Sequence, residues 1–398
     1  MAILVQKYGG SSVADVDKIG AVADKVALAK RAGNDVVVVV SAMGKATDGL
    51  LALAKSVAGD KDPPRRELDM LLSTGERVSM ALLSIALHAR GLDAISFTGS
   101  QSGIITNDRH FDARIIEVRP HRIEDELARG RIVIVAGYQG MSYRREITTL
   151  GRGGSDTTAV ALSAALGAER CEIYSDVDGV YTADPRVVPD AKHLPELSLE
   201  VLSEMAEAGA KVLNAQAVEW ARRNKVAIHA RKTADGADDG GHRGRETIAA
   251  DPSAHVHGER GQGVRAIVGL DKVVSVASEH RGILDAVAKL SLPVLDVAVG
   301  ASGTEFFVPL LNVPDWDGAA EALRSADSRI KIEGGFGLVS LVGDGLLGPT
   351  HCASRFQAVL LQHGVTPMRI AATPLRIAAL VKSTELAEAQ RALHAAFV

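Results

Sequence analysis

Short β-branched runs alternate with amphipathic segments over the first 230 residues, and this alternation restricts the fold more than any other feature of the sequence. Four short runs are typical of buried strands: 3–5, 35–40, 132–136 and 171–174. Five further segments carry apolar residues at spacings of three and four, as covering helices do: 13–31, 50–57, 77–90, 157–167 and 201–223. Strands that alternate with helices predict an α/β sandwich on a mostly parallel sheet, with ligands beyond the carboxyl ends of the strands.

The rest of the sequence predicts a connection and two small modules. Residues 234–263 are rich in Gly, Asp, His and Arg, and His242, His255 and His257 lack the regular spacing of a zinc site. Residues 264–398 show two similar passes of strand, helix, strand, strand and helix, typical of βαββαβ modules that sense an effector or form a dimer. We therefore expect an α/β enzyme domain (1–233), a linker (234–263), a first module (264–337) and a second module (338–398).

The composition excludes two classes of protein. The chain has 45 basic and 49 acidic side chains, a net charge of −4, and so no basic excess for nucleic acid or acidic lipid. No uninterrupted apolar run approaches the roughly 20 residues that cross a membrane. The first residues lack the features of a secretory signal, and Cys171 and Cys352 are far apart. We expect a cytoplasmic, disulfide-free protein that acts on small molecules.

A glycine turn follows the first run and fits a phosphate. It consists of Lys7, Tyr8, Gly9, Gly10 and Ser11. Glycines let the backbone approach a ligand, N–H groups at a helix N-terminus attract anions, and the lysine adds a positive charge. The pattern is neither GxxxxGK[ST] nor GxGxxG, and a tight turn between strand and helix needs glycine even without a ligand.

Two other small-residue segments point to the same edge of the sheet. Ser41 opens the turn SAMG directly after run 35–40, so this turn and the glycine turn can share one ligand. The segment STGE, which ends in Glu76, opens the helical segment 77–90. Its alternative interpretation is a Ser/Thr helix cap with a carboxylate in the first turn.

The segment most suggestive of a ligand is TTLGRGGSDTT, residues 148–158, which leads into a helix. A helix start needs one cap, whereas this segment has three glycines, several hydroxyls, Arg152 and Asp156. Arginine binds a carboxylate or phosphate through two parallel hydrogen bonds, and aspartate neutralises an ammonium group. Arg152 and Asp156 therefore match the two ends of an amino acid.

A second loop, residues 174–186, packs acidic and aromatic residues, a glycine and a proline after run 171–174. A turn alone does not need these residues. The loop fits a purine, a ribose and Mg²⁺-bound phosphates.

Six segments together resemble, in order and spacing, those of the aspartate kinases (aspartokinases) of the amino acid kinase family. They are KYGGSS, VSAMG, STGE, TGSQSGIIT, TTLGRGGSDTTAVAL and CEIYSDVDGVYTADPRVVP. The resemblance is close over the first 230 residues. It implies a three-layer α/β/α sandwich kinase domain, followed by a pair of ACT domains that agrees with the two predicted modules.

The resemblance implies transfer of the γ-phosphoryl group of MgATP to the β-carboxylate of L-aspartate, giving 4-phospho-L-aspartate and ADP. The substrate carboxylate attacks directly, so the protein must align two anions and neutralise charge on the moving group. By this resemblance the catalytic residues are Lys7, Asp156 and Arg152. Lys7 stabilises the transferred group and Arg152 clamps the α-carboxylate. Asp156 and Glu76 hold the ammonium end.

The resemblance also implies which residues line the two parts of the site. The substrate-binding residues are Ser41, Thr47, Glu76, Arg152, Gly153, Gly154, Ser155 and Asp156. The ATP-binding residues are Lys7, Tyr8, Gly9, Gly10, Ser11, Tyr174, Ser175, Asp176, Tyr181, Asp184, Arg186 and Lys211. ATP and Mg²⁺ are the implied cofactors, without a metal site of the protein's own, and a homodimer or higher homo-oligomer through the ACT modules is the implied assembly. A kinase for another small amino acid and an inactive ACT-type sensor are the alternatives.

The sequence departs from the family at three places. Asn214, Ala215 and Gln216 replace the usual residues after Lys211, beside the nucleotide site. In the first module, residues 278–283 lack the usual Pro-Gly, and in the second, residues 371–375 (AATPL) replace a polar segment. We therefore expect weakened or altered inhibition by lysine and threonine, unless Asp296, Glu305 and backbone amides suffice to bind them.

Overall fold

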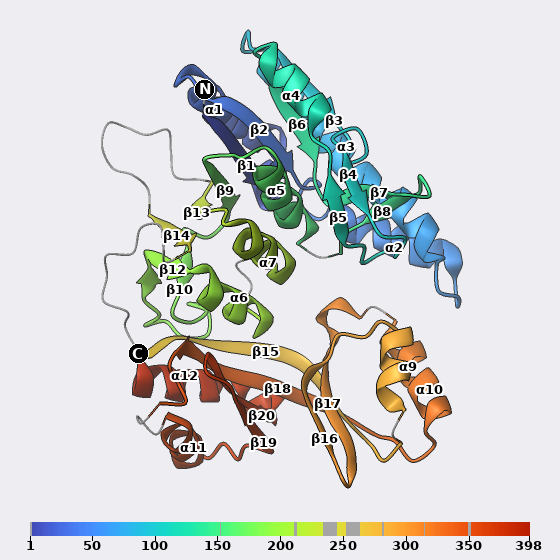
Figure 1. The fold of residues 1–398 in the computed structure, drawn as a ribbon, viewed down its shortest axis with the longest axis vertical. Helices are drawn as coiled ribbons and strands as arrows, with labels where there is room; N and C mark the ends of the chain where they lie inside the picture. The colour runs from blue at the N-terminus through green and yellow to red at the C-terminus, as the bar shows by residue number, and fades with distance from the viewer. Residues whose placement is uncertain are drawn as a thin grey trace. The chain divides into compact units, whose positions relative to one another are not determined.

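The computed structural model describes residues 2–151, 153–210, 213–233, 245–251, 263–280, 282–313, 315–348 and 352–398 (Figure 1). Contacts within the chain divide it into two compact units. The first comprises Met1–Val180, His193–Ala206 and Lys211–His257, and the second comprises Tyr181–Lys192, Glu207–Ala210 and Gly258–Val398.

An eight-stranded sheet forms the middle layer of the first unit, in the order β12-β14-β13-β9-β1-β2-β6-β3. Its strands are β1 (Ile3–Tyr8), β2 (Asp35–Val40), β3 (Ala94–Phe97), β6 (Ile132–Ala136), β9 (Arg170–Ser175), β12 (Glu196–Ser198), β13 (Ile228–Lys232) and β14 (Glu246–Ala250). All neighbours pair in parallel except β13 and β14. The four runs predicted as strands are β1, β2, β6 and β9.

Helices cover both faces of this sheet, because its central strands are buried on both sides. Val36, Val38 and Val40 of β2 pack in one hydrophobic cluster with residues of α1 (Val16–Arg31) and α3 (Arg65–His88). The alternate valines of β2 are equally buried, and α5 (Gly154–Ala165) packs against β1, β2 and β9, with α7 (Ala215–Asn224) beside it. This three-layer arrangement confirms the predicted fold class.

A smaller four-stranded sheet lies in the same unit, in the order β5-β4-β7-β8. Its strands are β4 (Ile104–Thr106), β5 (Ile115–Val118), β7 (Gln139–Ser142) and β8 (Ile147–Thr149). The remaining elements of this part of the chain are η1 (Gly10–Val13), α2 (Ala46–Ala58), α4 (His121–Ala128), β10 (Val180–Tyr181), β11 (His193–Leu194) and α6 (Leu199–Glu207).

Among the described helices, only α3 is long and apolar enough to cross a membrane. It carries the buried carboxylates of Asp69 and Glu76 and packs against α1, β3, β6 and β8. One face of this helix is therefore packed into the α/β unit.

The second unit is built on a six-stranded antiparallel sheet in the order β16-β17-β15-β18-β20-β19. Its strands are β15 (Gly263–Ser278), β16 (Leu295–Gly300), β17 (Gly303–Pro309), β18 (Lys331–Asp344), β19 (Arg369–Ala372) and β20 (Arg376–Lys382). Its helices are α9 (Ile283–Lys289), η2 (Leu310–Asn312), α10 (Trp316–Ala326), α11 (Cys352–Gln362), η3 (Ser383–Glu385) and α12 (Leu386–Phe397).

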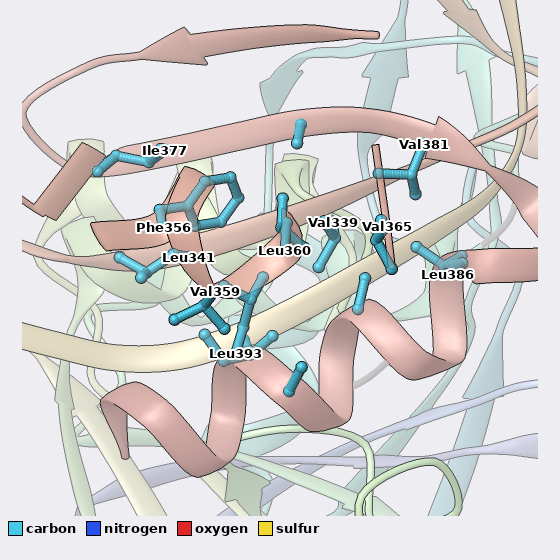
Figure 2. Close-up of a cluster of buried hydrophobic side chains, with 14 of the residues drawn as sticks. Val339, Leu341, Phe356, Val359, Leu360, Val365, Ile377, Val381, Leu386 and Leu393 are labelled. Carbon is cyan, nitrogen blue, oxygen red and sulfur yellow. The ribbon is translucent and has the colours of Figure 1, made fainter. Parts of the chain in front are cut away.

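The two modules of this unit share strands β15 and β18. Val274 and Val276, in the C-terminal half of β15, pack with Ile283 of α9 and Leu323 of α10. Ile267, in the N-terminal half, belongs to the cluster of β18, β20, α11 and α12 that Figure 2 shows. The first half of β15 therefore completes the second module, although the sequence prediction placed it in the first.

Two further segments differ from the linear division expected from the sequence. Residues 181–192 belong to the second unit because Ala183 and Val188 are buried in its larger cluster, and Thr182 O accepts a hydrogen bond from Ile267 N at 2.7 Å. Strand β14 lies inside the predicted linker but pairs with β12 and β13. The three histidines of that linker lie outside the described residues. Cys171 and Cys352 are both free.

Candidate active site

The glycine turn and the SAMG turn meet at the carboxyl ends of β1 and β2. Gly44 N donates to Gly10 O at 3.0 Å. A Cβ on Gly10 would lie 2.8 Å from Ala42 O, so only glycine permits this approach. The two turns therefore lie side by side, as expected for a shared ligand. Ser11, in η1, is exposed.

Lys7 and Asp156 form a nearly buried ion pair beside the glycine turn. Lys7 Nζ lies 2.6 Å from Asp156 Oδ1, and each side chain is 10% exposed. Lys7 comes from the end of β1, and Asp156 from the first turn of α5. A Cβ on Gly9 would lie 3.5 Å from Lys7 Nζ, which places the ammonium group next to the turn. The structure thus pairs two of the three predicted catalytic residues, Lys7 and Asp156, with each other.

Glu76 lies in the interior of α3, so the prediction that STGE opens a helix is wrong. Ser73 Oγ and Thr74 Oγ1 donate to the carbonyls of Met70 and Leu71, three residues earlier, so neither caps the helix. Glu76 Oε1 accepts from Ala42 N at 3.1 Å. The carboxylate is 3% exposed, and burial raises its pKa to about 7.

Glu76 Oε2 is buried and has no hydrogen-bond partner in the described part of the chain. This acceptor lies on a carboxylate that contacts the SAMG turn. Ser41 and Thr47 are half-buried, Ser41 directly after β2 and Thr47 in the first turn of α2. A common pocket for the three residues stays a prediction.

Packing accounts for the glycines of the loop that leads into α5. Gly151 and Gly153 both have φ of +75°, which favours glycine. A Cβ on Gly154 would lie 2.6 Å from Leu150 Cβ. Ser155 is buried, and Arg152 lies outside the described residues.

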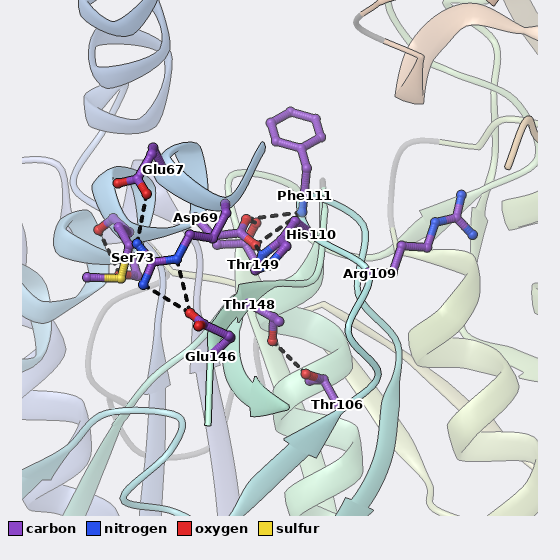
Figure 3. Close-up of polar contacts among 12 residues, drawn as sticks. Glu67, Asp69, Ser73, Thr106, Arg109, His110, Phe111, Glu146, Thr148 and Thr149 are labelled. Carbon is purple, nitrogen blue, oxygen red and sulfur yellow. Dashed lines mark hydrogen bonds and ion pairs between the residues drawn. The ribbon is translucent and has the colours of Figure 1, made fainter. Parts of the chain in front are cut away.

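The hydroxyls of segment 148–158 suggested contacts to a ligand, but its four threonines use their hydroxyls inside the protein. Thr148 Oγ1 lies 2.6 Å from Thr106 Oγ1, and Thr149 Oγ1 donates to Asp69 Oδ1 at 2.5 Å (Figure 3). Both threonines are fully buried. The expectation is therefore corrected for Thr148 and Thr149, whose hydroxyls bond to β4 and α3.

Tyr8 and Tyr174 were implied to line the nucleotide site, but their rings lie in the hydrophobic cluster beneath α1. The rings stack at 4.8 Å between centroids, and burial is the main cause that raises the pKa of Tyr174 to about 12. Strand alternation sends the side chains of Lys7 and Tyr8 to opposite faces of the sheet. Tyr174 contacts Gly9 through its backbone: Gly9 N donates to Tyr174 O at 3.1 Å.

The remaining nucleotide-site residues are divided between the units. Ser175 and Asp176 belong to the first unit, and Tyr181, Asp184 and Arg186 to the second. Asp184 and Arg186 form a two-bond ion pair, with distances of 2.9 and 2.8 Å. Lys211 lies outside the described residues.

Asn214, one of the departures from the family, is the N-cap of α7. Its Oδ1 accepts from Gln216 N at 2.8 Å and from Ala217 N at 3.3 Å. It also accepts from Thr157 Oγ1 of α5 at 3.3 Å. The departure therefore has a structural role next to the glycine-rich loop.

Sequence reasoning missed several residues around this site. Ser12 Oγ lies 2.6 Å from Thr233 Oγ1, which donates to Ser175 O and so ties the glycine turn to the end of β9. Tyr138, with φ of +67°, packs against Gly154. Nothing in a single sequence indicates that a tyrosine has a positive φ. Ser12, in contrast, is part of the motif KYGGSS, but the sequence analysis gave it no role.

The model of the amino acid kinase family matches residues 2–231. This chain belongs to that family. Among its members, the aspartokinase of Mycolicibacterium smegmatis is 44% identical over 409 aligned residues, covering 100% of this chain and 96% of the relative. The resemblance to aspartokinases found in the sequence is therefore confirmed.

Solved aspartokinases share the fold over the whole chain. Escherichia coli aspartokinase III in complex with aspartate and ADP (R-state) has a TM-score of 0.85 at 25% identity, covering 99% of both chains. The same enzyme in complex with lysine and aspartate (T-state) has a TM-score of 0.71, with the same identity and coverage.

Proposed function

We propose that this chain transfers the γ-phosphoryl group of MgATP to the β-carboxylate of L-aspartate, forming 4-phospho-L-aspartate and ADP. The main support from the structure is the Lys7–Asp156 ion pair at the glycine turn. The alignment with an aspartokinase also covers 100% of this chain. The solved neighbour bound to aspartate and ADP supports both substrates.

Lys7 has the position and charge to stabilise the transferred group. The substrate carboxylate is itself the nucleophile, so the protein supplies alignment and positive charge. Asp156 holds the Lys7 ammonium beside Gly9, in a place from which most water is excluded. Electrostatic stabilisation is stronger in such a place than in water.

Glu76 and Arg152 are proposed to hold the two ends of the amino acid. An aspartate ammonium beside Glu76 would supply the hydrogen-bond donor that Oε2 lacks and would favour the ionised carboxylate. Arg152 is assigned to the α-carboxylate because guanidinium groups bind carboxylates through two parallel hydrogen bonds. Ser41, Thr47 and the loop 153–155 complete the proposed pocket.

Mg²⁺ is proposed to enter with the nucleotide as MgATP. Within the described ranges, no group of three or more His, Cys, Asp or Glu side chains is placed to hold a metal ion. Mg²⁺ commonly binds through substrate phosphates with one or two carboxylates, and this arrangement needs no larger cluster. Within the first unit, Ser175, Asp176 and Lys211 are the proposed contacts to the nucleotide. The proposed location is the cytoplasm.

ADP release by the purified chain tests the proposal. MgATP is supplied with L-aspartate, with L-glutamate, or without an amino acid, and hydroxylamine trapping detects the acyl phosphate. Aspartate-dependent ADP release with equal hydroxamate formation supports the proposal. ADP release that does not respond to aspartate would refute it, and a larger kcat/KM for another amino acid would replace aspartate as the substrate.

A further inference from the structure

A buried carboxylate outside the Lys7–Asp156 pair joins three segments of the first unit. Asp69, in α3, is fully buried. It accepts from His110 Nδ1 at 2.6 Å, from Phe111 N at 3.1 and 3.2 Å, and from Thr149 Oγ1 at 2.5 Å. Figure 3 shows these donors converging on it from the turn after β4 and from β8.

The turn that Asp69 holds packs against the start of the glycine-rich loop. Ala113 N donates to Thr149 O at 2.8 Å. A Cβ on Gly151 would lie 3.1 Å from Asp112 Oδ1 and 3.6 Å from Phe111 O. The turn therefore contacts both ends of the segment Thr149–Gly151, which directly precedes Arg152 in the sequence.

The same segment supports the first turn of α5. Gly154 N donates to Gly151 O at 3.1 Å, and Gly154 packs closely against Leu150. Two residues further along, Asp156 pairs with Lys7. A continuous path of contacts thus runs from Asp69 through Thr149 and Gly151 to the ion pair of the candidate site.

We propose that Asp69, with His110 and Thr149, is a positioning residue for the aspartate-binding loop. The inference rests on the proposed function and adds a residue to it. Three donors from two segments fix the Asp69 carboxylate. One of these segments contains Thr149, and the other contacts Thr149 and Gly151. A displacement of reacting groups by about 1 Å costs up to about 10²-fold in rate, so a distant anchor has a measurable effect.

The first test compares two substitutions of Thr149. Thr149→Val keeps the shape of the side chain and removes only the hydroxyl that donates to Asp69, whereas Thr149→Ser keeps the hydroxyl. We expect Thr149→Val to raise the KM for aspartate about tenfold with less than twofold change in the KM for ATP. Thr149→Ser should return the KM for aspartate to within about twofold of the unmodified chain. Asp69→Asn and His110→Ala should act in the same direction as Thr149→Val.

Thr106→Val is the matched control. It removes a buried threonine hydroxyl bond of 2.6 Å in the same four-stranded sheet without touching Asp69. We expect it to lower the thermal midpoint as Thr149→Val does, with an unchanged KM for aspartate. Thermal unfolding of each variant separates loss of stability from loss of positioning.

Two outcomes are distinguishable. If the unmodified chain is active and Thr149→Val keeps its KM for aspartate within twofold, the positioning role is refuted, whether or not Asp69→Asn folds. If the unmodified chain shows no aspartate-dependent ADP release, the proposed function itself fails, and this inference fails with it.

Discussion

At the scale of single residues, the Lys7–Asp156 pair is the feature that stability alone explains least. Burying two charges costs solvation free energy that their attraction repays only partly. A nearly buried pair of this kind is weak evidence for a stabilising role. The Lys7 ammonium lies next to Gly9, which instead agrees with a lysine that binds an anion at the glycine turn.

The first prediction concerns Lys7→Ala. It should lower kcat by about 10²–10³ with a smaller effect on either KM, because charge stabilisation in the transition state is lost. Steady-state kinetics at saturating MgATP and aspartate measures this. Lys30→Ala is the control, since Lys30 forms a partly buried pair with Asp35 at 3.1 Å, at the start of β2. Near-normal kcat in Lys7→Ala would contradict the assignment.

The second prediction follows from the buried carboxylate of Glu76. Its pKa is raised from 4.5 to about 7 by burial, so the folded protein binds more protons than the unfolded chain between these values. The contribution of Glu76 to the free energy of unfolding therefore falls as pH rises from about 4.5 to 7, by a total of about 3 kcal/mol.

Denaturant unfolding of the ligand-free protein at several pH values between 5 and 8 checks this. The unmodified chain should lose stability relative to Glu76→Gln as pH rises, because glutamine cannot ionise. Parallel curves for the two proteins would contradict it.

At the scale of elements, the N-terminus of α7 gives the third prediction. Asn214→Ala should lower the free energy of unfolding by about 1 kcal/mol, because Asn214 caps the helix. Asn224→Ala, at the other end of the same helix, removes only an exposed bond to Trp220 O and should change it by less than about 0.5 kcal/mol. Chemical denaturation measures both, and equal effects would contradict the capping role.

Four strands of the main sheet, β1, β2, β6 and β9, were predictable because each is a short, mostly apolar run buried on both faces. The other four, β3, β12, β13 and β14, were not predicted. The start of α3 was not predictable, because Ser73, Thr74 and Gly75 have the composition of a helix start although they lie inside the helix. In the structure the two hydroxyls bond to carbonyls of their own helix. Gly75 is needed because a Cβ there would lie 2.8 Å from Ala42 Cβ. That contact joins residues 33 positions apart, and local sequence does not encode it.

The candidate site shows the same limit. The loops that carry Lys7 and Asp156 were predicted from their composition, but the direct contact of the two side chains was not. The direction of the Tyr8 side chain, opposite to that of Lys7, follows from strand alternation and was derivable from the sequence. The anchor at Asp69 was not derivable, because its partners His110 and Thr149 come from distant segments.

At the scale of the whole molecule, the six-stranded sheet of the second unit leaves β16 at one edge. Val297 and Val299 on this strand are 44% and 71% exposed. An apolar edge strand favours pairing with another chain, and a two-fold dimer is the commonest closed assembly. The fourth prediction is therefore a homodimer or a multiple of it.

Light scattering at micromolar concentration measures the assembly. We expect at least twice the mass of the chain, and Val299→Lys should weaken the association. Val16→Lys, at a 77% exposed valine of α1, is the control and should leave the mass unchanged. A monomeric mass for the unmodified chain would refute this prediction.

Inhibition by lysine or threonine, if present, would also belong to the whole molecule, and the second unit holds the residues that bear on it. Arg376 pairs with Asp296 at 2.9 Å, with side chains 11% and 9% exposed, and Arg369 pairs with Glu305 at 3.2 Å. Both acidic residues that the sequence offered to an effector ammonium thus contact an arginine. Asp296 Oδ2 has no partner within the described ranges, but it is buried.

The segment 371–375 offers little more to an effector. Thr373 Oγ1 accepts from Arg376 N at 3.0 Å, and Thr373 N donates to Arg376 O at 2.7 Å, so both groups close the turn between β19 and β20. Pro374 has no N–H to give to an effector carboxylate. A ligand shifts a conformational equilibrium only through different affinity for the two states, and these contacts leave few groups to supply it.

The fifth prediction is therefore weak inhibition by lysine and threonine, and activity titrations with each amino acid alone and with both together measure it. Flat curves to about 10 mM, far above the usual range of KM values, are expected. Arg376→Gln provides the internal comparison, because it would free Asp296 for an ammonium group without changing the kinase residues. Half-inhibition of the unmodified chain below 1 mM would show that the paired acids or the backbone amides of this unit still bind an effector, and would overturn the prediction.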